Sequence, residues 1–228
     1  MPDTPLAGRH VLVTAGPTYE DIDPVRFLGN RSSGRMGFAV AAAARAAGAR
    51  VTLVAGPVAL DAPAGVERID VRSAAQMHEA VMAALPADAY VGAAAVADFT
   101  PATVSGHKIK KGPGDAGLVL ELVRTRDILA DVAAHPQRPA LVVGFAAETG
   151  NLEANARGKL DAKKLDLVCA NRVGVPGSGF ESSDNALEVY WNGGHRRIGP
   201  APKAAVAAEL VGLVAGRLVD PTTGRPRP

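Results

Sequence analysis

The chain has 228 residues, of which 47% are hydrophobic and only 4% aromatic, so it is long enough for one domain with a core rich in alanine and valine. Its net charge of +2, with acidic and basic residues interspersed, gives no reason to expect a nucleic-acid or membrane partner. The single cysteine, Cys169, excludes an internal disulfide and a cysteine-rich metal site, and the lack of a signal-peptide pattern or of an apolar run of roughly 18 residues predicts a cytoplasmic protein.

The first half of the chain alternates between short apolar runs and segments with helical character. Apolar runs that end at glycine and proline are typical of buried parallel strands. The predicted strands lie at 11–15, 51–54 and 66–71 and from Tyr90 toward Asp98, and the predicted helices lie at 37–47 and 74–85. This alternation predicts an α/β fold, doubly wound around a mainly parallel sheet.

The alternation breaks at a long irregular insertion, residues 99–117, which contains Lys108-Ile109-Lys110-Lys111. A hairpin strand that leaves the main sheet, at 118–123, is expected to follow it. Beyond it we expect a helix that Thr125 caps and that ends near 134, a strand at 140–145, a helix at 152–163 and a strand at 167–171. A loop at 172–184, a hairpin of 186–191 with 196–198 and a last helix at 202–218 complete the prediction. Residues 1–8 are predicted to be a linker remnant and 220–228 a disordered tail, which leaves 9–219 as a single domain.

The loop between the first strand and the first helix, AGPTYEDIDPVRFLGNRSSGRMG, is unusually long. Such loops usually have about 2–6 residues, so a long ordered one is often functional. Its last part opens the helix with small residues, and Arg31 and Arg35 add positive charge to the free N–H groups there. We expect an anion-binding loop formed by Ser32, Ser33, Gly34, Met36 and Gly37. The alternative is a serine N-cap with two glycines for close packing, but Arg26 and Asn30 in the same loop favour a site.

Four informative segments follow the predicted ends of strands: 16–37, 94–111, 145–150 and 171–184. Ligands of open parallel sheets bind outside the carboxyl ends of the strands, so these segments should gather at one edge. Lys108 and Lys110 alternate on an extended segment and point one way, as in a flap over polyphosphate, although a solvated basic edge has the same pattern.

Several polar side chains have two interpretations each. Asp98 can bind Mg²⁺ that bridges phosphates or cap a turn, and Asp127 can cap a helix. Asn30 can offer its amide to a developing oxyanion or act as a turn residue. Lys159 and Lys163 share a helix face, which is either an anion site or an ordinary exposed face.

Other catalytic signatures are missing from the sequence. The five histidines have no zinc-ligand spacing, and there is no nucleophile elbow, P-loop or G-x-G-x-x-G after the first strand. The residues alone therefore predict an α/β enzyme that binds a phosphorylated ligand, a nucleotide by preference.

The loop quoted above, together with AAAVADFTP, KIKK, VGFAAET, KLDAKKLDLVCAN and SDNAL, resembles the phosphopantothenate–cysteine ligase family, the synthetase domain of the bacterial bifunctional coenzyme A enzyme. The resemblance extends from about Arg9 to Leu218. It implies a Rossmann-like three-layer fold with a flap, a homodimer, and a flavin-dependent decarboxylase domain preceding this one in a full-length protein. It also implies that CTP and Mg²⁺ activate 4′-phosphopantothenate as an acyl-cytidylate, which then reacts with L-cysteine.

Matching positions carry the family's functional residues onto this chain. The resemblance implies catalytic roles for Asn30, Lys108 and Arg26, and a metal contact for Asp98, mostly through the CTP phosphates. It implies nucleotide binding by Gly92, Ala93, Ala94, Asp98, Lys108, Arg126, Asp127, Ile128, Leu129, Phe145, Lys159 and Lys163. Arg126 is a departure, since related sequences can carry proline there, which is compatible with a contact through the backbone alone.

Two other functions are alternatives to the ligase. A nicotinamide-dependent oxidoreductase predicts a glycine-rich first turn, which the sequence lacks. A phosphate-binding or dimerisation module without catalysis is disfavoured because Asn30, Asp98 and Lys108 are all present.

Overall fold

The structure, a computed structural model, describes residues 4–112, 117–148, 150–172 and 184–219. Within these ranges the chain forms an eight-stranded sheet in the order β12-β11-β10-β9-β6-β1-β4-β5. The parallel strands are β1 (His10–Ala15), β4 (Arg50–Ala55), β5 (Glu67–Asp70), β6 (Ala89–Gly92), β9 (Leu141–Glu148) and β10 (Leu167–Arg172). At one edge, β11 (Asp184–Trp191) and β12 (Gly194–Pro202) continue the sheet antiparallel.

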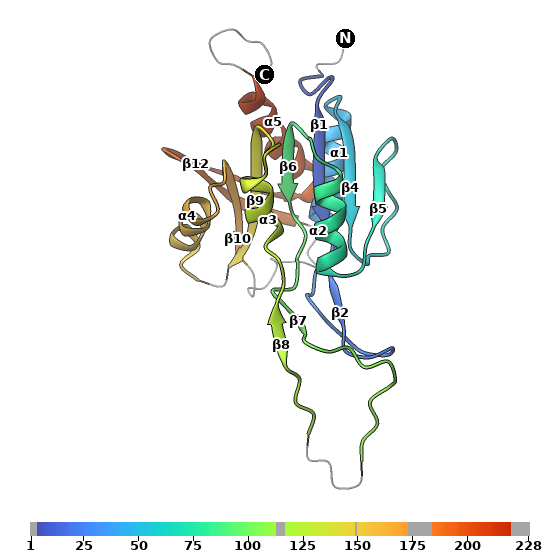
Figure 1. The fold of residues 1–228 in the computed structure, drawn as a ribbon. Coiled ribbons are helices and arrows are strands. Elements are labelled where there is room, and N and C mark those ends of the chain that lie inside the picture. Colours follow the sequence, from blue (N-terminus) through green and yellow to red (C-terminus); the bar gives the residue numbers. More distant parts are fainter. Residues whose placement is uncertain (1–3, 113–116, 149, 173–183, 220–228) are drawn as a thin grey trace.

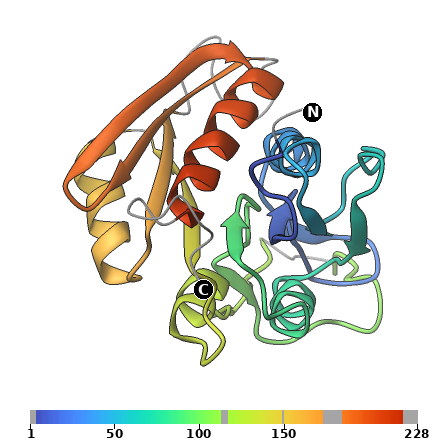
Figure 2. The ribbon, with the colours of Figure 1, turned by 90° about the horizontal axis from the view of Figure 1, so that it is seen from above.

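Helices cover both faces of this sheet, as Figures 1 and 2 show. One face carries α1 (Arg35–Ala46) and α5 (Lys203–Leu218), and the other carries α2 (Ala74–Ala83), α3 (Ile128–Ala134) and α4 (Leu152–Ala162). Alternate residues of a strand point to opposite faces, so Val11 and Val13 join the core under α1 and α5 while Leu12 joins the other. The predicted three-layer α/β fold with a mainly parallel sheet is confirmed.

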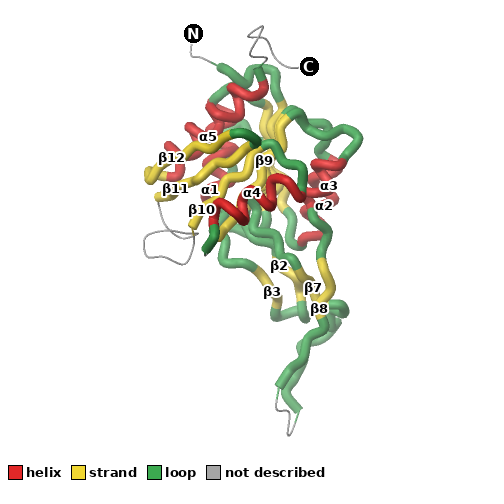
Figure 3. Tube along the Cα trace, turned by 90° about the vertical axis from the view of Figure 1, so that its left-hand side faces the viewer, coloured by secondary structure: helices red, strands yellow, loops and turns green. Residues whose placement is uncertain are grey.

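Two small hairpins project from the carboxyl edge of the sheet (Figures 1 and 3). In the first, β2 (Tyr19–Asp21) pairs antiparallel with β3 (Phe27–Gly29), and in the second, β7 (Phe99–Pro101) pairs with β8 (Leu122–Arg124). We call these segments, residues 19–29, 99–112 and 117–124, the arm. The predicted flap insertion is thus present, but its second strand is confined to 122–124 instead of 118–123.

Local differences from the sequence prediction concern helix starts. Helix α1 begins at Arg35, and its N-cap is Gly34 with φ 74° and no side-chain cap, so the serine cap is wrong. A left-handed backbone there suits glycine. Helix α3 is capped by Asp127, whose carboxylate accepts from the Ala130 N–H at 3.1 Å, and not by Thr125.

At the chain ends, Leu6 is fully buried within the core under α1, although residues 1–8 were expected to be a linker. Its N–H donates to the Ala47 carbonyl at 2.9 Å. The whole predicted tail (220–228) and residues 173–183 of the predicted loop at 172–184 fall outside the described residues.

Candidate active site

The site forms where the chain leaves the central strands β1 and β6. β1 is flanked by β4 on one side and β6 on the other, so the direction of winding changes between β1 and β6. Such switch points are where open α/β sheets bind ligands. The loops after these two strands are joined: Pro17 pairs with Ala95, and the Ala95 N–H donates to the Gly16 carbonyl at 2.8 Å.

A first cleft of about 450 Å³ opens at this edge, on the face that carries α3 and α4. It contains every residue expected to bind nucleotide except Ala93 and Lys108. Its lining is formed by Thr14, Tyr90, Gly92, Ala94, Val96, Ala97, Asp98, Phe99, Arg124, Thr125, Arg126, Asp127, Ile128, Leu129, Phe145, Lys159 and Lys163.

Charged groups in the first cleft are held by short contacts. Lys163 Nζ lies 2.6 Å from Asp127 Oδ2, and Lys159 Nζ donates to the Phe145 carbonyl at 2.6 Å. Burial, followed by the nearby charge of Lys163, lowers the pKa of the Lys159 ammonium. Burial raises the pKa of Asp127, but the hydrogen bonds from Lys163 and the Ala130 N–H outweigh it and leave the pKa below its usual value. Asp127 is thus both the α3 cap and a wall of the cleft.

A second cleft of about 670 Å³ opens on the face that carries α1 and α5. It contains the whole predicted anion-binding loop, Asn30, and Ala93. Its lining is formed by Asn30, Arg31, Ser32, Ser33, Gly34, Arg35, Met36, Gly37, Ala93, Ala94, Ala95, Asp98, Phe145, Ala146, Ala147, Glu148, Lys159, Asn171, Asn185 and Lys203. At the start of α1, a Cβ on Gly37 would lie 2.5 Å from the Ala15 Cβ, so this glycine lets the helix approach the end of β1 closely.

Asn171, Asn185 and Lys203 line the second cleft without having been named as site residues, although Asn171 lies in the segment 171–184 that was expected at this edge. Lys203 is the first residue of α5 and only 8% exposed, and burial together with nearby Arg35 lowers its pKa. Asn185 is also 8% exposed and its amide approaches the Met36 sulfur at 3.6 Å. The SDNAL motif was a signal for Asn185, but nothing in the sequence marks Lys203 as buried beside α1.

The two clefts share four residues: Ala94, Asp98, Phe145 and Lys159. The two clefts lie on opposite faces of the sheet and therefore meet only at the ends of its central strands. The two clefts therefore have a common wall at these four residues.

Asn30 lies in the second cleft and is tied to the loop after β6. Its Nδ2 donates to the carbonyls of Ala95 at 3.1 Å and Val96 at 3.2 Å. The predicted interaction of this amide with an oxyanion stays a prediction.

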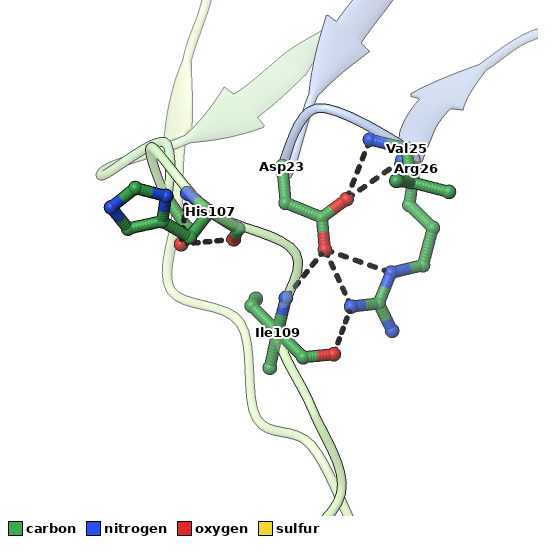
Figure 4. A network of polar contacts seen from close by, with 6 residues as sticks. Asp23, Val25, Arg26, His107 and Ile109 are labelled. Carbon is green, nitrogen blue, oxygen red and sulfur yellow. Dashed lines mark hydrogen bonds and ion pairs between the residues drawn. The ribbon is translucent and has the colours of Figure 1, made fainter.

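Arg26 and Lys108 line neither cleft. Lys108 is exposed on the arm, and Arg26 bonds Asp23 and the backbone of Ile109 beside it (Figure 4). Their catalytic roles also stay predictions.

A divalent cation could use Asp98, whose carboxylate borders both clefts. Among the residues that the structure describes, no three His, Cys, Asp or Glu side chains lie close enough to hold a metal ion by themselves. Mg²⁺ is commonly bound by one or two carboxylates together with substrate phosphates, and one carboxylate at the wall fits that pattern.

The chain matches the family model described as DNA/pantothenate metabolism flavoprotein C-terminal domain over residues 6–218. It is 49% identical over 208 residues to the coenzyme A biosynthesis bifunctional protein CoaBC of Vibrio vulnificus (strain YJ016), covering 91% of this chain and 52% of that protein. It is 52% identical over 195 residues to the protein of the same name from Bacillus subtilis (strain 168), covering 85% and 47%. The chain thus spans about half the length of the curated relatives it matches.

Among solved structures, the chain resembles the crystal structure of the C-terminal domain of a coenzyme A biosynthesis bifunctional protein CoaBC. The TM-score is 0.80 at 38% identity, and the match covers 94% of this chain and 98% of that one. A more distant match, a DNA/pantothenate metabolism flavoprotein from Streptococcus pneumoniae, has a TM-score of 0.78 at 20% identity and shows the fold alone.

Proposed function

The chain belongs to the family of the DNA/pantothenate metabolism flavoprotein C-terminal domain, and from this premise we propose that it ligates 4′-phosphopantothenate to L-cysteine at the expense of CTP. The observation that carries this function is the pair of clefts that meet at Asp98 and Lys159. A ligase that activates an anionic carboxylate with a nucleoside triphosphate needs two anion-binding compartments with a common wall where the reacting atoms meet.

In this proposal CTP occupies the first cleft and phosphopantothenate the second. The phosphate of phosphopantothenate binds at the start of α1, where the N–H groups of the first turn and Arg35 favour an anion, and its carboxylate reaches the common wall. A carboxylate oxygen attacks the α-phosphorus of CTP, the bond to the bridging oxygen breaks, and pyrophosphate leaves. The amine of cysteine then attacks the acyl carbon, loses a proton and expels CMP.

The protein's contribution is positioning and charge compensation, so no nucleophilic side chain is required. Lys159 lies at the wall and faces negative charge from both substrates. Mg²⁺ bound to the triphosphate would supply further charge neutralisation, with Asp98 as its protein ligand. Asn30 is proposed to donate to the acyl oxygen as charge develops on it.

The proposed reaction predicts that pyrophosphate is released from CTP only when phosphopantothenate is present, and that CMP appears when cysteine is added. Coupled assays for pyrophosphate and chromatographic detection of CMP measure the two steps separately. Pyrophosphate release in the absence of phosphopantothenate would contradict the proposal. CTP binding without turnover would favour a binding module, and substrate-dependent oxidation of a nicotinamide cofactor would favour an oxidoreductase.

We propose in addition that the arm joins two copies of this chain into a homodimer. Among the described residues, every large hydrophobic side chain that is exposed lies on the arm: Val25, Phe27, Phe99, Val104, Leu118, Val119, Leu122 and Val123. An apolar patch of this kind marks a protein interface, and closed two-fold dimers are the commonest homo-oligomers.

The double substitution Val119→Glu and Leu122→Glu is expected to convert the dimer into a monomer, because it places two like charges in an apolar contact. Size-exclusion chromatography with light scattering measures the mass. Thr103→Glu, an exposed polar position of the same arm, is the matched control and should remain dimeric. If the wild-type chain is monomeric, or the double variant remains a dimer, the arm is not the interface.

We propose that a flavin-dependent decarboxylase domain precedes this one in a full-length protein and that the protein acts in the cytoplasm. The match to about half the length of relatives named bifunctional supports a second domain. As to membranes, none of the described helices has both the length and the apolar character needed to cross one.

A further inference from the structure

The two hairpins of the arm are joined at one buried carboxylate, that of Asp23 (Figure 4). Asp23 lies in the turn between β2 and β3 and is 2% exposed. Its Oδ1 accepts hydrogen bonds from the backbone N–H groups of Val25 and Arg26, each at 2.9 Å. Its Oδ2 accepts from Arg26 Nε at 3.0 Å, from Arg26 Nη2 at 2.5 Å and from the backbone N–H of Ile109 at 3.1 Å. The turn of the first hairpin therefore binds the second hairpin directly.

Arg26 makes a second hydrogen bond to the backbone of Ile109. Its Nη2 also donates to the Ile109 carbonyl at 2.8 Å, so both backbone groups of this residue are bound by one ion pair. A neighbouring strand would satisfy the same two groups in the same way. A further link lies nearby, where the Ser105 N–H donates to the Ile22 carbonyl at 3.0 Å.

The charge of Asp23 maintains these hydrogen bonds at neutral pH. The Arg26 guanidinium holds the pKa of Asp23 well below its usual range, and the N–H groups of Val25 and Ile109 reinforce the effect. The carboxylate is thus ionised throughout the range in which the enzyme would work, and its hydrogen bonds are charge-assisted.

Lys108, the residue directly before Ile109, lies outside both clefts in this structure. For its ammonium to reach CTP, the segment around it must swing toward the first cleft. The hydrogen bonds to the backbone of Ile109 hold the chain directly after Lys108. Ile109 is therefore the point about which the segment that carries Lys108 can turn.

We propose that Asp23 and Arg26 form a clamp that positions the Lys108 flap, and that Arg26 acts on the reaction through the flap. This inference rests on the proposed function and on the contact with CTP that the family resemblance implies for Lys108. When Ile109 is held in place, the Lys108 ammonium can reach the phosphates in few orientations. On an unrestrained loop it would sample many orientations, most of them unproductive. Asp23 is therefore a positioning residue.

The test begins with Asp23→Asn, which keeps the size of the side chain but replaces one acceptor oxygen by a donor facing Arg26 and Ile109. Hydrogen–deuterium exchange at the Ile109 amide, and trypsin cleavage after Lys108, should each be at least about tenfold faster than in the wild type. The rate of phosphopantothenate-dependent pyrophosphate release should fall between about tenfold and about 100-fold, with the KM for phosphopantothenate unchanged. Unchanged exchange at Ile109 overturns the clamp.

Asp21→Asn is the matched control, because the Asp21 carboxylate belongs to the same hairpin but pairs with Arg72 at 2.7 Å, away from the flap. It should change none of the three readouts: exchange at Ile109, trypsin cleavage after Lys108 and the rate of pyrophosphate release. Arg26→Lys, at a side chain that is 42% exposed, keeps the charge but cannot bridge Asp23 and the Ile109 carbonyl with a planar fork. It should shift all three readouts in the same direction as Asp23→Asn, which keeps the test valid if Asp23→Asn folds poorly.

The double variant Asp23→Asn/Lys108→Ala separates this inference from the proposed function. If Asp23 acts only through Lys108, the double variant releases pyrophosphate at the rate of Lys108→Ala alone. If the rate of the double variant is reduced by the product of the two single reductions, Asp23 does not act through Lys108 and the positioning role is overturned. The proposed ligase function is not affected by that outcome. A fully active Lys108→Ala variant would instead contradict the role of Lys108 in the proposed function, and exchange at Ile109 would still decide whether the clamp exists.

Discussion

Lys159→Met is expected to lower kcat/KM about 100- to 1,000-fold and to raise the KM for both CTP and phosphopantothenate. Lys159 is one of the four residues common to both clefts, and it is their only shared cation in the described part of the chain. Its Nζ is fixed by the Phe145 carbonyl at 2.6 Å, so the charge is already oriented before substrates bind. Methionine has a similar length and suits a buried position, so the loss should be one of charge. Steady-state pyrophosphate release with each substrate varied in turn measures the effect.

Lys163→Met is the control for this prediction. Lys163 lies one helical turn further along the same face, lines only the first cleft, and pairs with Asp127 at 2.6 Å. Its replacement should raise the KM for CTP and leave the KM for phosphopantothenate unchanged. If Lys159→Met affects CTP alone, the common wall does not serve both substrates. Thermal unfolding followed by circular dichroism should confirm that both variants are folded.

Asn30→Ala is expected to slow CMP release about 100-fold or more and pyrophosphate release less, so that the acyl-cytidylate accumulates. Negative charge builds on the acyl oxygen when cysteine attacks the acyl carbon, but is drawn away from the carboxylate when it attacks CTP. A donor amide at this oxygen therefore assists the second step more than the first. Rapid quenching with separation of labelled intermediate, pyrophosphate and CMP distinguishes the steps.

Asn155→Ala provides a matched loss of an exposed amide. Asn155 donates to Glu148 Oε2 at 2.6 Å and lines neither cleft, so both steps should proceed at the wild-type rate. Equal slowing of both steps in Asn30→Ala would point to a role in holding the loop after β6, to which its Nδ2 is bonded, in place of oxyanion stabilisation.

The layout of the sheet was predictable because its strands are buried on both faces. A run such as Val11-Leu12-Val13 is apolar at successive positions, which only a strand covered from both sides requires. The gathering of Asn30, Asp98 and Phe145 at one edge followed from the rule for strand ends, and the structure brings all three to the second cleft.

The remaining elements lacked a local signal. The strands β2 and β3 are three residues each, and their one buried residue is the charged Glu20, so they show no hydrophobic alternation. Asp127 and not Thr125 caps α3, and the Thr125 hydroxyl donates instead to the Ala97 carbonyl at 2.6 Å, a contact with a residue far away in the sequence. Lys203 reaches the second cleft only because α5 packs beside α1, and no pattern near position 203 records that.

Helix α5 sets where neighbouring domains can be tethered. Its first residue lines the second cleft, and its 16 residues carry the chain roughly 24 Å along the axis to the far rim of the sheet. Leu6 is bound to Ala47, at the end of α1 farthest from the clefts, and Figure 1 shows the start of the described chain and the end of α5 at the same rim of the sheet. A decarboxylase domain linked ahead of Leu6 would therefore be attached at the rim of the sheet farthest from the clefts. Because the linkage then leaves the openings of the clefts uncovered, we expect phosphopantothenate to enter the second cleft from solvent.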